Sequence, residues 1–223
     1  MPGARARMRR VGEDIRKAAS VIAGRDGERG LEVLVLERGA SNRFLPGYVA
    51  FPGGSMDAGD VALAERWFGS TEEVARACAV RELLEEVGLA LTAGGLSEAD
   101  GRSLESLGSP PGTDLIEIAH WVAPEQVPVR FDARYFAVEA PGGLRAVPDG
   151  GETADAWWAS PEELLEDWRA ERRKLYWPTS FTMREIASCA NVAELLALRI
   201  DTRVPDPEEL ERLPRSTFWQ GEA

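Results

Sequence analysis

The sequence has few of the residues that most often build zinc or redox sites. It contains one His and two Cys, Cys78 and Cys189, which stand far apart. A single His excludes a zinc site built on several histidines, and two isolated cysteines lack the spacing of a thiolate metal site. We expect both thiols to stay reduced rather than to form a disulfide, as is usual in the cytosol.

Long apolar runs are also missing. No stretch reaches the roughly twenty apolar residues that span a bilayer. The arginines of residues 5–10 are not followed by a sustained apolar run, so no signal peptide is expected. The C-terminus is not a peroxisomal address. The sequence therefore predicts a cytoplasmic protein with no membrane partner, and a disordered basic arm at residues 1–14.

Positive charge is scarce as well. Acidic residues exceed basic ones, 38 against 26, which gives a formal net charge of −12. This balance argues against a surface that coats nucleic acid, so no nucleic-acid partner is expected. An anionic substrate would need metal ions and a local patch of arginines. All but two of the basic residues are Arg, which either favours forked contacts to phosphate or reflects genome composition.

The order of the expected elements predicts a mixed sheet between helical layers. Alternating apolar residues and turn signals predict strands at 18–23, 31–37, 48–51, 114–122, 132–140 and 153–158. Helices are expected at 71–87, from residue 160 onwards, at 179–188 and at 190–199, with Pro205 and Pro207 ending the last. Residues 92–113 are expected to form a polar loop with a short helix. One domain over 15–200 and a tail at 201–223 are the expected organisation.

One acidic helix carries the strongest chemical signal. Glu82, Glu85 and Glu86 stand at positions i, i+3 and i+4, so their carboxylates share one helix face. Crowded acids repel one another unless a cation joins them, and a cluster of hard oxygen donors suits Mg²⁺ or Mn²⁺. Gly88 follows, where a left-handed residue ends a helix. A solvated acidic helix face is the alternative interpretation.

Two segments around this helix resemble the Nudix box, G-x5-E-x7-R-E-U-x-E-E-x-G-U with U aliphatic. They are Phe-Pro-Gly-Gly at 51–54 and Arg-Glu-Leu-Leu-Glu-Glu-Val-Gly-Leu at 81–89. The family places its first Glu six positions after the box glycine, where this chain has Asp60. Glu73 has the correct spacing to the second segment, so we place an insertion of about thirteen residues within 55–72.

The inserted segment contains two neighbouring aromatic residues, Trp67 and Phe68. We expect them to form a patch that caps the site or contacts the second subunit of a homodimer. A folded surface loop without a role is the alternative.

The resemblance implies both fold and chemistry. The fold would be α/β, the Nudix α/β/α sandwich with a mixed β-sheet and extra C-terminal helices. The activity would be hydrolysis of a phosphoric anhydride bond with Mg²⁺ or Mn²⁺ as cofactor. Glu82, Glu85 and Glu86 would be the metal ligands, Glu82 and Glu86 being also catalytic. Glu73 and Arg81 would form an ion pair that orients the helix and its ligands.

Flanking motifs resemble the branch of this family that cleaves CoA and acyl-CoA, as does an insertion at this point. Residues 34–54 resemble L-L-T-x-R-S-x-x-R-x3-G-x3-F-P-G-G, with one residue too many between the two arginines, and residues 130–136 resemble R-F-D-T-R-F-F. The resulting candidates for binding a small nucleotide substrate are Arg38, Arg43, Gly53, Gly54, Arg130 and Phe131. Surface ion pairs for the arginines and core packing for the strand aromatics are the alternatives.

The resemblance also leaves other functions open. An enzyme that acts on ADP-ribose or on a dinucleotide uses the same box. A catalytically silent Nudix domain that binds a ligand is a further alternative.

A last expectation concerns an acid outside the box, which Nudix enzymes commonly recruit from a loop as ligand or general base. The loop at 147–153 is punctuated by Pro and Gly, so its acids should be presented rather than buried. Glu152 is our choice for a catalytic role, with Asp149 second. Each of the two is alternatively a solvated acid of a turn.

Overall fold

The structure is a computed structural model that describes residues 15–108, 110, 112–123, 130–203 and 207–218. The strands are β1 (Arg16–Gly27), β2 (Gly30–Arg38), β3 (Tyr48–Ala50), β4 (Gly53–Ser55), β5 (Leu89–Thr92), β6 (Gly95–Glu98), β7 (Ile116–Val122), β8 (Phe131–Glu139), β9 (Thr153–Ala159) and β10 (Lys174–Leu175). The α-helices are α1 (Ala58–Phe68), α2 (Val74–Val87), α3 (Pro161–Arg169), α4 (Trp177–Ile186), α5 (Val192–Ala197) and α6 (Pro207–Glu211). Short 3-10 helices are η1 (Thr71–Glu73), η2 (Gly112–Asp114) and η3 (Arg215–Thr217). The basic arm expected at 1–14 lies outside the described residues.

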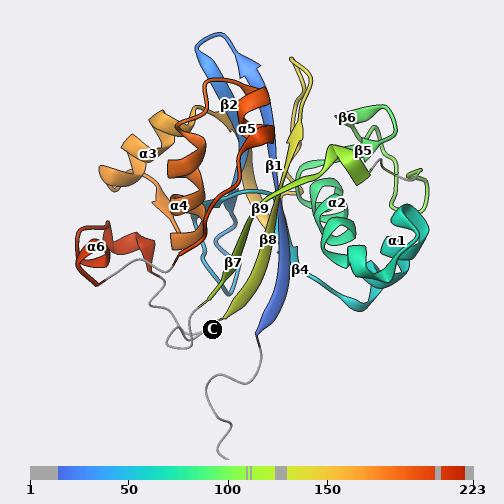
Figure 1. The fold of residues 1–223 in the computed structure, drawn as a ribbon, viewed down its shortest axis with the longest axis horizontal. Helices are drawn as coiled ribbons and strands as arrows, with labels where there is room; N and C mark the ends of the chain where they lie inside the picture. Colours follow the sequence, from blue (N-terminus) through green and yellow to red (C-terminus); the bar gives the residue numbers. More distant parts are fainter. Residues whose placement is uncertain (1–14, 109, 111, 124–129, 204–206, 219–223) are drawn as a thin grey trace, which may run out of the picture.

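Eight strands form one mixed sheet (Figure 1). Its main path runs β10-β3-β2-β1-β8-β7, with β4 paired to β1 and β9 paired to β2. β1 and β8 are parallel, whereas β1 and β2 form an antiparallel hairpin. β2 pairs with β1 only along the last residues of β1, 24–27, so β4 takes the neighbouring place beside residues 18–20 of β1. This arrangement fixes the glycine turn at the middle of the sheet.

Helices cover both faces of this sheet. In Figure 1, α1, α2 and the β5–β6 ribbon lie on one side of it, and α3, α4 and α5 lie on the other. Successive strand residues point to opposite faces, so Val21 joins the core beneath α1 and α2 while Ile22 joins the core beneath α3 to α5. Leu34 and Val35 divide in the same way. The predicted α/β architecture, with a mixed sheet between helical layers, is confirmed.

The segment 55–72, in which we expected an insertion, contains the helix α1. A reciprocal cap starts α1: Asp57 accepts a hydrogen bond from the N–H of Asp60 at 3.2 Å, and Asp60 accepts one from the N–H of Asp57 at 2.9 Å. Trp67 is only 4% exposed and packs into the core beneath α1 and α2, with Phe68 partly buried against the same core. The expected aromatic cap over the site is therefore wrong, because burial against the sheet draws both rings inward.

The other predicted elements are confirmed with shifted ends. The polar segment 92–113 contributes β6, which pairs with β5, in addition to loop. Pro207 begins α6 instead of ending a helix, since proline is tolerated at the first helical position and α5 already ends at Ala197. In the described part of the chain, no helix has the length and apolar character needed to cross a membrane.

Candidate active site

A cavity of about 660 Å³ opens where the glycine turn, the acidic helix and the first half of β1 meet. The described residues that line it include nine of the predicted site residues: Arg38, Gly53, Gly54, Arg81, Glu82, Glu85, Glu86, Phe131 and Glu152. Asp149 lines it too, whereas Arg43, Glu73 and Arg130 do not. One cavity thus collects residues from segments that are more than a hundred positions apart.

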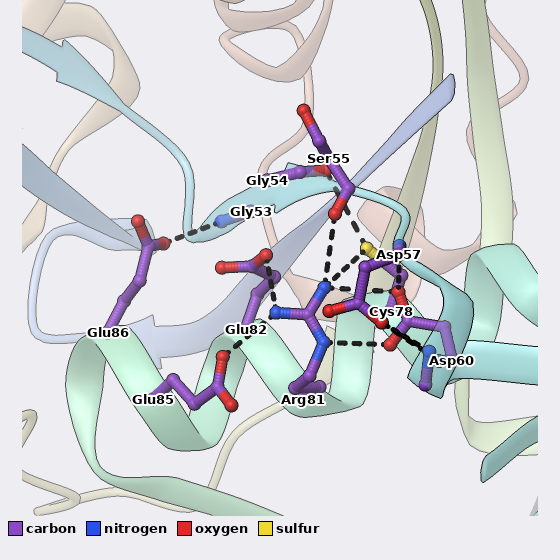
Figure 2. A network of polar contacts seen from close by, with 11 residues as sticks. Gly53, Gly54, Ser55, Asp57, Asp60, Cys78, Arg81, Glu82, Glu85 and Glu86 are labelled. Carbon is purple, nitrogen blue, oxygen red and sulfur yellow. Dashed lines mark hydrogen bonds and ion pairs between the residues drawn. The ribbon is translucent and has the colours of Figure 1, made fainter. Parts of the chain in front are cut away.

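The three glutamates of α2 face this cavity (Figure 2). Glu82 and Glu86 are buried, 9% and 5% exposed, while the side chain of Glu85 is about half exposed. Glu86 accepts a hydrogen bond from the backbone N–H of Gly53 at 2.8 Å. Burial raises the pKa of Glu86 to about 8, and the neighbouring charge of Glu82 adds to the increase. Burial also raises the pKa of Glu82.

The two glycines of β4 are required by close approach. A Cβ atom on Gly54 would lie 2.3 Å from Oε1 of Glu82, and one on Gly53 would lie 2.4 Å from Oγ of Ser20. Gly54 pairs with Ala19 of β1, which holds the turn against the sheet. A side chain at position 53 would push β4 away from β1, and one at position 54 would displace the carboxylate of Glu82, so the two glycines allow the turn to lie against both β1 and Glu82.

Arg81 lies between the two glutamates Glu82 and Glu85 and the acid Asp60 (Figure 2), and it is buried. Its Nε and Nη2 atoms donate to the two carboxylate oxygens of Asp60, at 2.7 and 3.1 Å. Its Nη1 atom donates to Glu82 and to Glu85, at 2.8 Å each. Nη2 also donates to the backbone carbonyl of Ser55 at 3.1 Å. Arg81 therefore joins the glycine turn, α1 and the glutamates.

The predicted ion pair between Glu73 and Arg81 is wrong. Glu73 instead pairs with Arg76, three residues along the same helical segment. Asp60, which is completely buried, is the acid that pairs with Arg81. The sequence carried one signal for this outcome, because Asp60 stands six positions after Gly54, where the box has its first acid.

The glutamates fit a divalent cation. In the portion of the chain that the structure describes, no three His, Cys, Asp or Glu side chains are already grouped as a metal site, because Arg81 draws Glu82 and Glu85 aside and Gly53 holds Glu86. The donors are nevertheless carboxylate oxygens, which Mg²⁺ and Mn²⁺ prefer. Two of them are buried together with raised pKa values, and a cation relieves this electrostatic cost.

The two candidate loop acids differ in what they contact. Asp149 accepts hydrogen bonds from the backbone N–H groups of Glu152 and Thr153, at 3.1 and 2.7 Å. Partial burial opposes ionisation of Asp149, but these backbone donors outweigh it and lower its pKa. Asp149 thus holds the turn. Glu152 lines the cavity, and its charge contributes to the raised pKa of Glu86.

The predicted arginines separate into one at the cavity and two outside it. Arg38 lines the cavity, donates to the carbonyl of Phe44 and to Asn42, each at 3.2 Å, and lowers the pKa of Glu86 by its charge. Arg43 is exposed. Arg130 donates to the carbonyl of Ala123 at 3.2 Å.

Three aromatic rings, those of Phe44, Phe131 and Tyr176, also line the cavity, and the sequence predicted only Phe131. Phe44 packs on Phe131 with ring centroids 5.5 Å apart and meets Tyr176 edge to face at 5.7 Å. Arg16 lines the cavity as well. Nothing local in the sequence marks Phe44 or Tyr176, which come from the loop before β3 and from the residue before α4.

This fold and this arrangement of glutamates around a Gly-Gly turn are those of a NUDIX domain. The chain belongs to this family, since the model of the NUDIX domain matches residues 14–177. Enzymes of the family generally use divalent metal ions.

Two relatives illustrate the similarity. A Caenorhabditis elegans protein named "Putative nudix hydrolase 7" is 26% identical over 188 residues, which are 77% of this chain and 60% of that protein. The chain therefore spans about 60% of the length of this curated relative. A NUDIX hydrolase from Alicyclobacillus acidocaldarius, known from a crystal structure, is 28% identical, with a TM-score of 0.70 over 85% of this chain and 99% of that chain.

A more distant structural match is a C. elegans Ap4A hydrolase in a binary complex. It is 15% identical and has a TM-score of 0.49, covering 78% of this chain and 96% of that chain. At this identity and score the match says nothing about the substrate of this chain.

Proposed function

We propose that this protein is a metal-dependent diphosphatase that cleaves CoA or acyl-CoA into 3′,5′-ADP and phosphopantetheine or its acyl derivative. Water is the second reactant. The observation that carries the proposal is that one cavity is lined both by three glutamates and by a cluster of aromatic rings. The glutamates suit a diphosphate with its metal ion, and the rings suit the organic part of such a substrate.

Glu82, Glu85 and Glu86 are the residues that would hold the metal. A bound Mg²⁺ or Mn²⁺ supplies neutralisation of phosphate charge and a lowered pKa for a water molecule. Gly53 and Gly54 let the backbone approach the diphosphate, which a side chain at either position would prevent. Glu152 is the candidate proton acceptor, because it lines the cavity and Asp149 is occupied by the turn.

The choice of CoA rests on the motifs around the box. Arg38 and Phe131, both named from those motifs, line the cavity. Arg38 offers a guanidinium to a phosphate, and Phe131 offers a ring to the adenine base. Arg43 and Arg130, named from the same motifs, lie outside the cavity, and they give the CoA assignment no support.

ADP-ribose or a dinucleotide is the second candidate substrate. Such a molecule also combines a diphosphate with an aromatic base, and the same glutamates and rings of the cavity would accept it. A silent ligand-binding module is less favoured, since all three glutamates face the cavity.

Hydrolysis of CoA, acetyl-CoA, ADP-ribose and NADH should be compared side by side, with Mg²⁺ and with Mn²⁺. We expect kcat/KM to be highest for CoA or acetyl-CoA and to vanish in chelator. A clear preference for ADP-ribose or NADH would replace the CoA assignment. Failure to hydrolyse any of the four, with tight binding of one of them, would support the ligand-binding module.

A further inference from the structure

The helix inserted into the box contributes a buried acid to the site. Asp60 lies in the first turn of α1 and is completely buried. Both of its carboxylate oxygens accept from Arg81, at 2.7 and 3.1 Å, and one also accepts from the N–H of Asp57. The acid is therefore fixed on two sides, by the cap of its own helix and by the guanidinium.

Glu73 differs from Asp60 in each of these respects, although its spacing to Arg81 matches the box. Its partner is Arg76, and its side chain is 34% exposed. It lines a surface depression with Trp67 and Phe68 rather than the cavity that holds the glutamates of α2.

We propose that Asp60, rather than Glu73, is the acid that positions Arg81 and, through it, orients Glu82 and Glu85 for a divalent cation. Asp60 is thus a positioning residue. The Nudix box of this chain is interrupted after its first acid, and the rest of α1 and η1 lie between that acid and the remainder of the box. This inference rests on the proposed metal-dependent function.

The physical reason lies in how one guanidinium is shared among three carboxylates. Asp60 engages Nε and Nη2 in a forked pair, which fixes the plane of the guanidinium. Nη1 alone remains for Glu82 and Glu85. Without the carboxylate of Asp60, Arg81 is free to turn fully onto the two glutamates and to compete with a cation for their oxygens. Because the pair is buried, this competition is weakly screened.

The test is a Mn²⁺ titration without substrate, followed by calorimetry, on Asp60→Asn with Glu73→Gln as the matched control. Both variants replace one acid by its amide. We expect Asp60→Asn to raise the Kd for Mn²⁺ by at least about tenfold, and Glu73→Gln to change it by less than roughly twofold. An unchanged Kd in Asp60→Asn, or an equal increase in Glu73→Gln, overturns the inference.

Because a buried acid is altered, Asp60→Asn should first be checked for folding by circular dichroism. If it does not fold, Asp57→Ala provides the test. Asp57 is exposed and its carboxylate accepts from the backbone N–H groups of Gly59 and Asp60, so its loss loosens the start of α1 that carries Asp60, although the N–H of residue 57 still donates to the Asp60 carboxylate. For this variant we expect the Kd for Mn²⁺ to increase by about threefold, which corresponds to the free energy lost with one helix N-cap. An unchanged Kd for Mn²⁺ overturns the inference. Wild-type protein that binds no Mn²⁺ overturns the metal-dependent function and the inference together, whereas equal binding by all variants overturns the inference alone.

Discussion

Glu82 and Glu86 lie one helical turn apart on α2, and the same burial that presents them to the cavity makes their negative charge costly. The pKa of both groups is raised, that of Glu86 to about 8. Gly54 is what brings them so near the sheet, because its missing side chain leaves the space that Glu82 occupies. At the scale of residues, burial therefore makes ionisation of these two carboxylates unfavourable.

This cost predicts a pH dependence of stability in metal-free buffer. The folded protein holds a proton on Glu86 up to about pH 8, whereas the ordinary pKa of 4.5 leaves the unfolded chain deprotonated. The free energy of unfolding should therefore fall as the pH rises between these two values. Thermal melts in chelator should show a larger fall in Tm from pH 5 to pH 8 for wild type than for Glu86→Gln. Parallel curves for the two proteins would contradict the prediction.

The loop acids allow a second prediction at this scale. Glu152→Gln should lower kcat by at least about a hundredfold, as expected for loss of a general base. The Mg²⁺ concentration at half-maximal rate should stay within roughly twofold, since Glu152 is not one of the proposed ligands. Asp149→Asn is the comparison, and it should chiefly lower Tm because Asp149 holds the turn. An unaltered kcat in Glu152→Gln would move the role to Asp149 or to a glutamate of α2.

At the scale of elements, α1 links the core to the site. Its first turn holds Asp60 against Arg81, and its last turn places Trp67 in the core beneath α1 and α2. A segment that interrupts a catalytic motif thus adds both packing and a polar contact. Loss of the helix would remove both, so its effects on stability and on activity should appear together.

Trp67 and Phe68 provide a matched pair that tests this packing. Trp67→Ala should lower the free energy of unfolding by about 3–5 kcal/mol, the range for a large buried ring. Phe68→Ala should cost less than half as much, because Phe68 is only partly buried. Urea unfolding of the two variants gives both values. An equal loss of unfolding free energy in the two variants would contradict the prediction that Trp67 contributes more to the core than Phe68.

At the scale of the whole molecule, the cavity draws on both helical layers. The glutamates come from α2 on one side of the sheet, and Tyr176 comes from the residue before α4 on the other. The cavity lies beside the first half of β1, where β4 rather than β2 is the neighbouring strand. The glutamates and Tyr176 therefore reach one cavity from opposite faces of the sheet.

Tyr176→Ala tests the aromatic rings of the cavity. Loss of one ring should raise KM for the preferred substrate by roughly tenfold, as for loss of one stacking contact, and change kcat by less than about threefold. Trp157→Ala is the control, because Trp157 is partly buried but does not line the cavity. A fall in kcat with unchanged KM in Tyr176→Ala would place the ring near the reacting phosphates instead.

The sequence by itself determined the local features of this protein. The three glutamates share a helix face because the α-helical period places i, i+3 and i+4 together. The strands followed from alternating apolar residues, and the glycine turn from its composition. The family resemblance was readable for the same reason, since residues 81–89 match the second part of the box without a gap.

Only the tertiary structure decided which distant residues meet. Asp60 and Glu73 are both acids at spacings that the box allows, and packing of α1 against α2 brought Asp60 to Arg81 and turned Glu73 outward. Arg38 and Arg43 were equivalent in the sequence, yet only Arg38 faces the cavity. Phe44, Phe131 and Tyr176 came together across the fold. The physical reason is that local periodicity sets the direction of a side chain relative to its own helix or strand, whereas its neighbours depend on long-range burial, which no local pattern encodes.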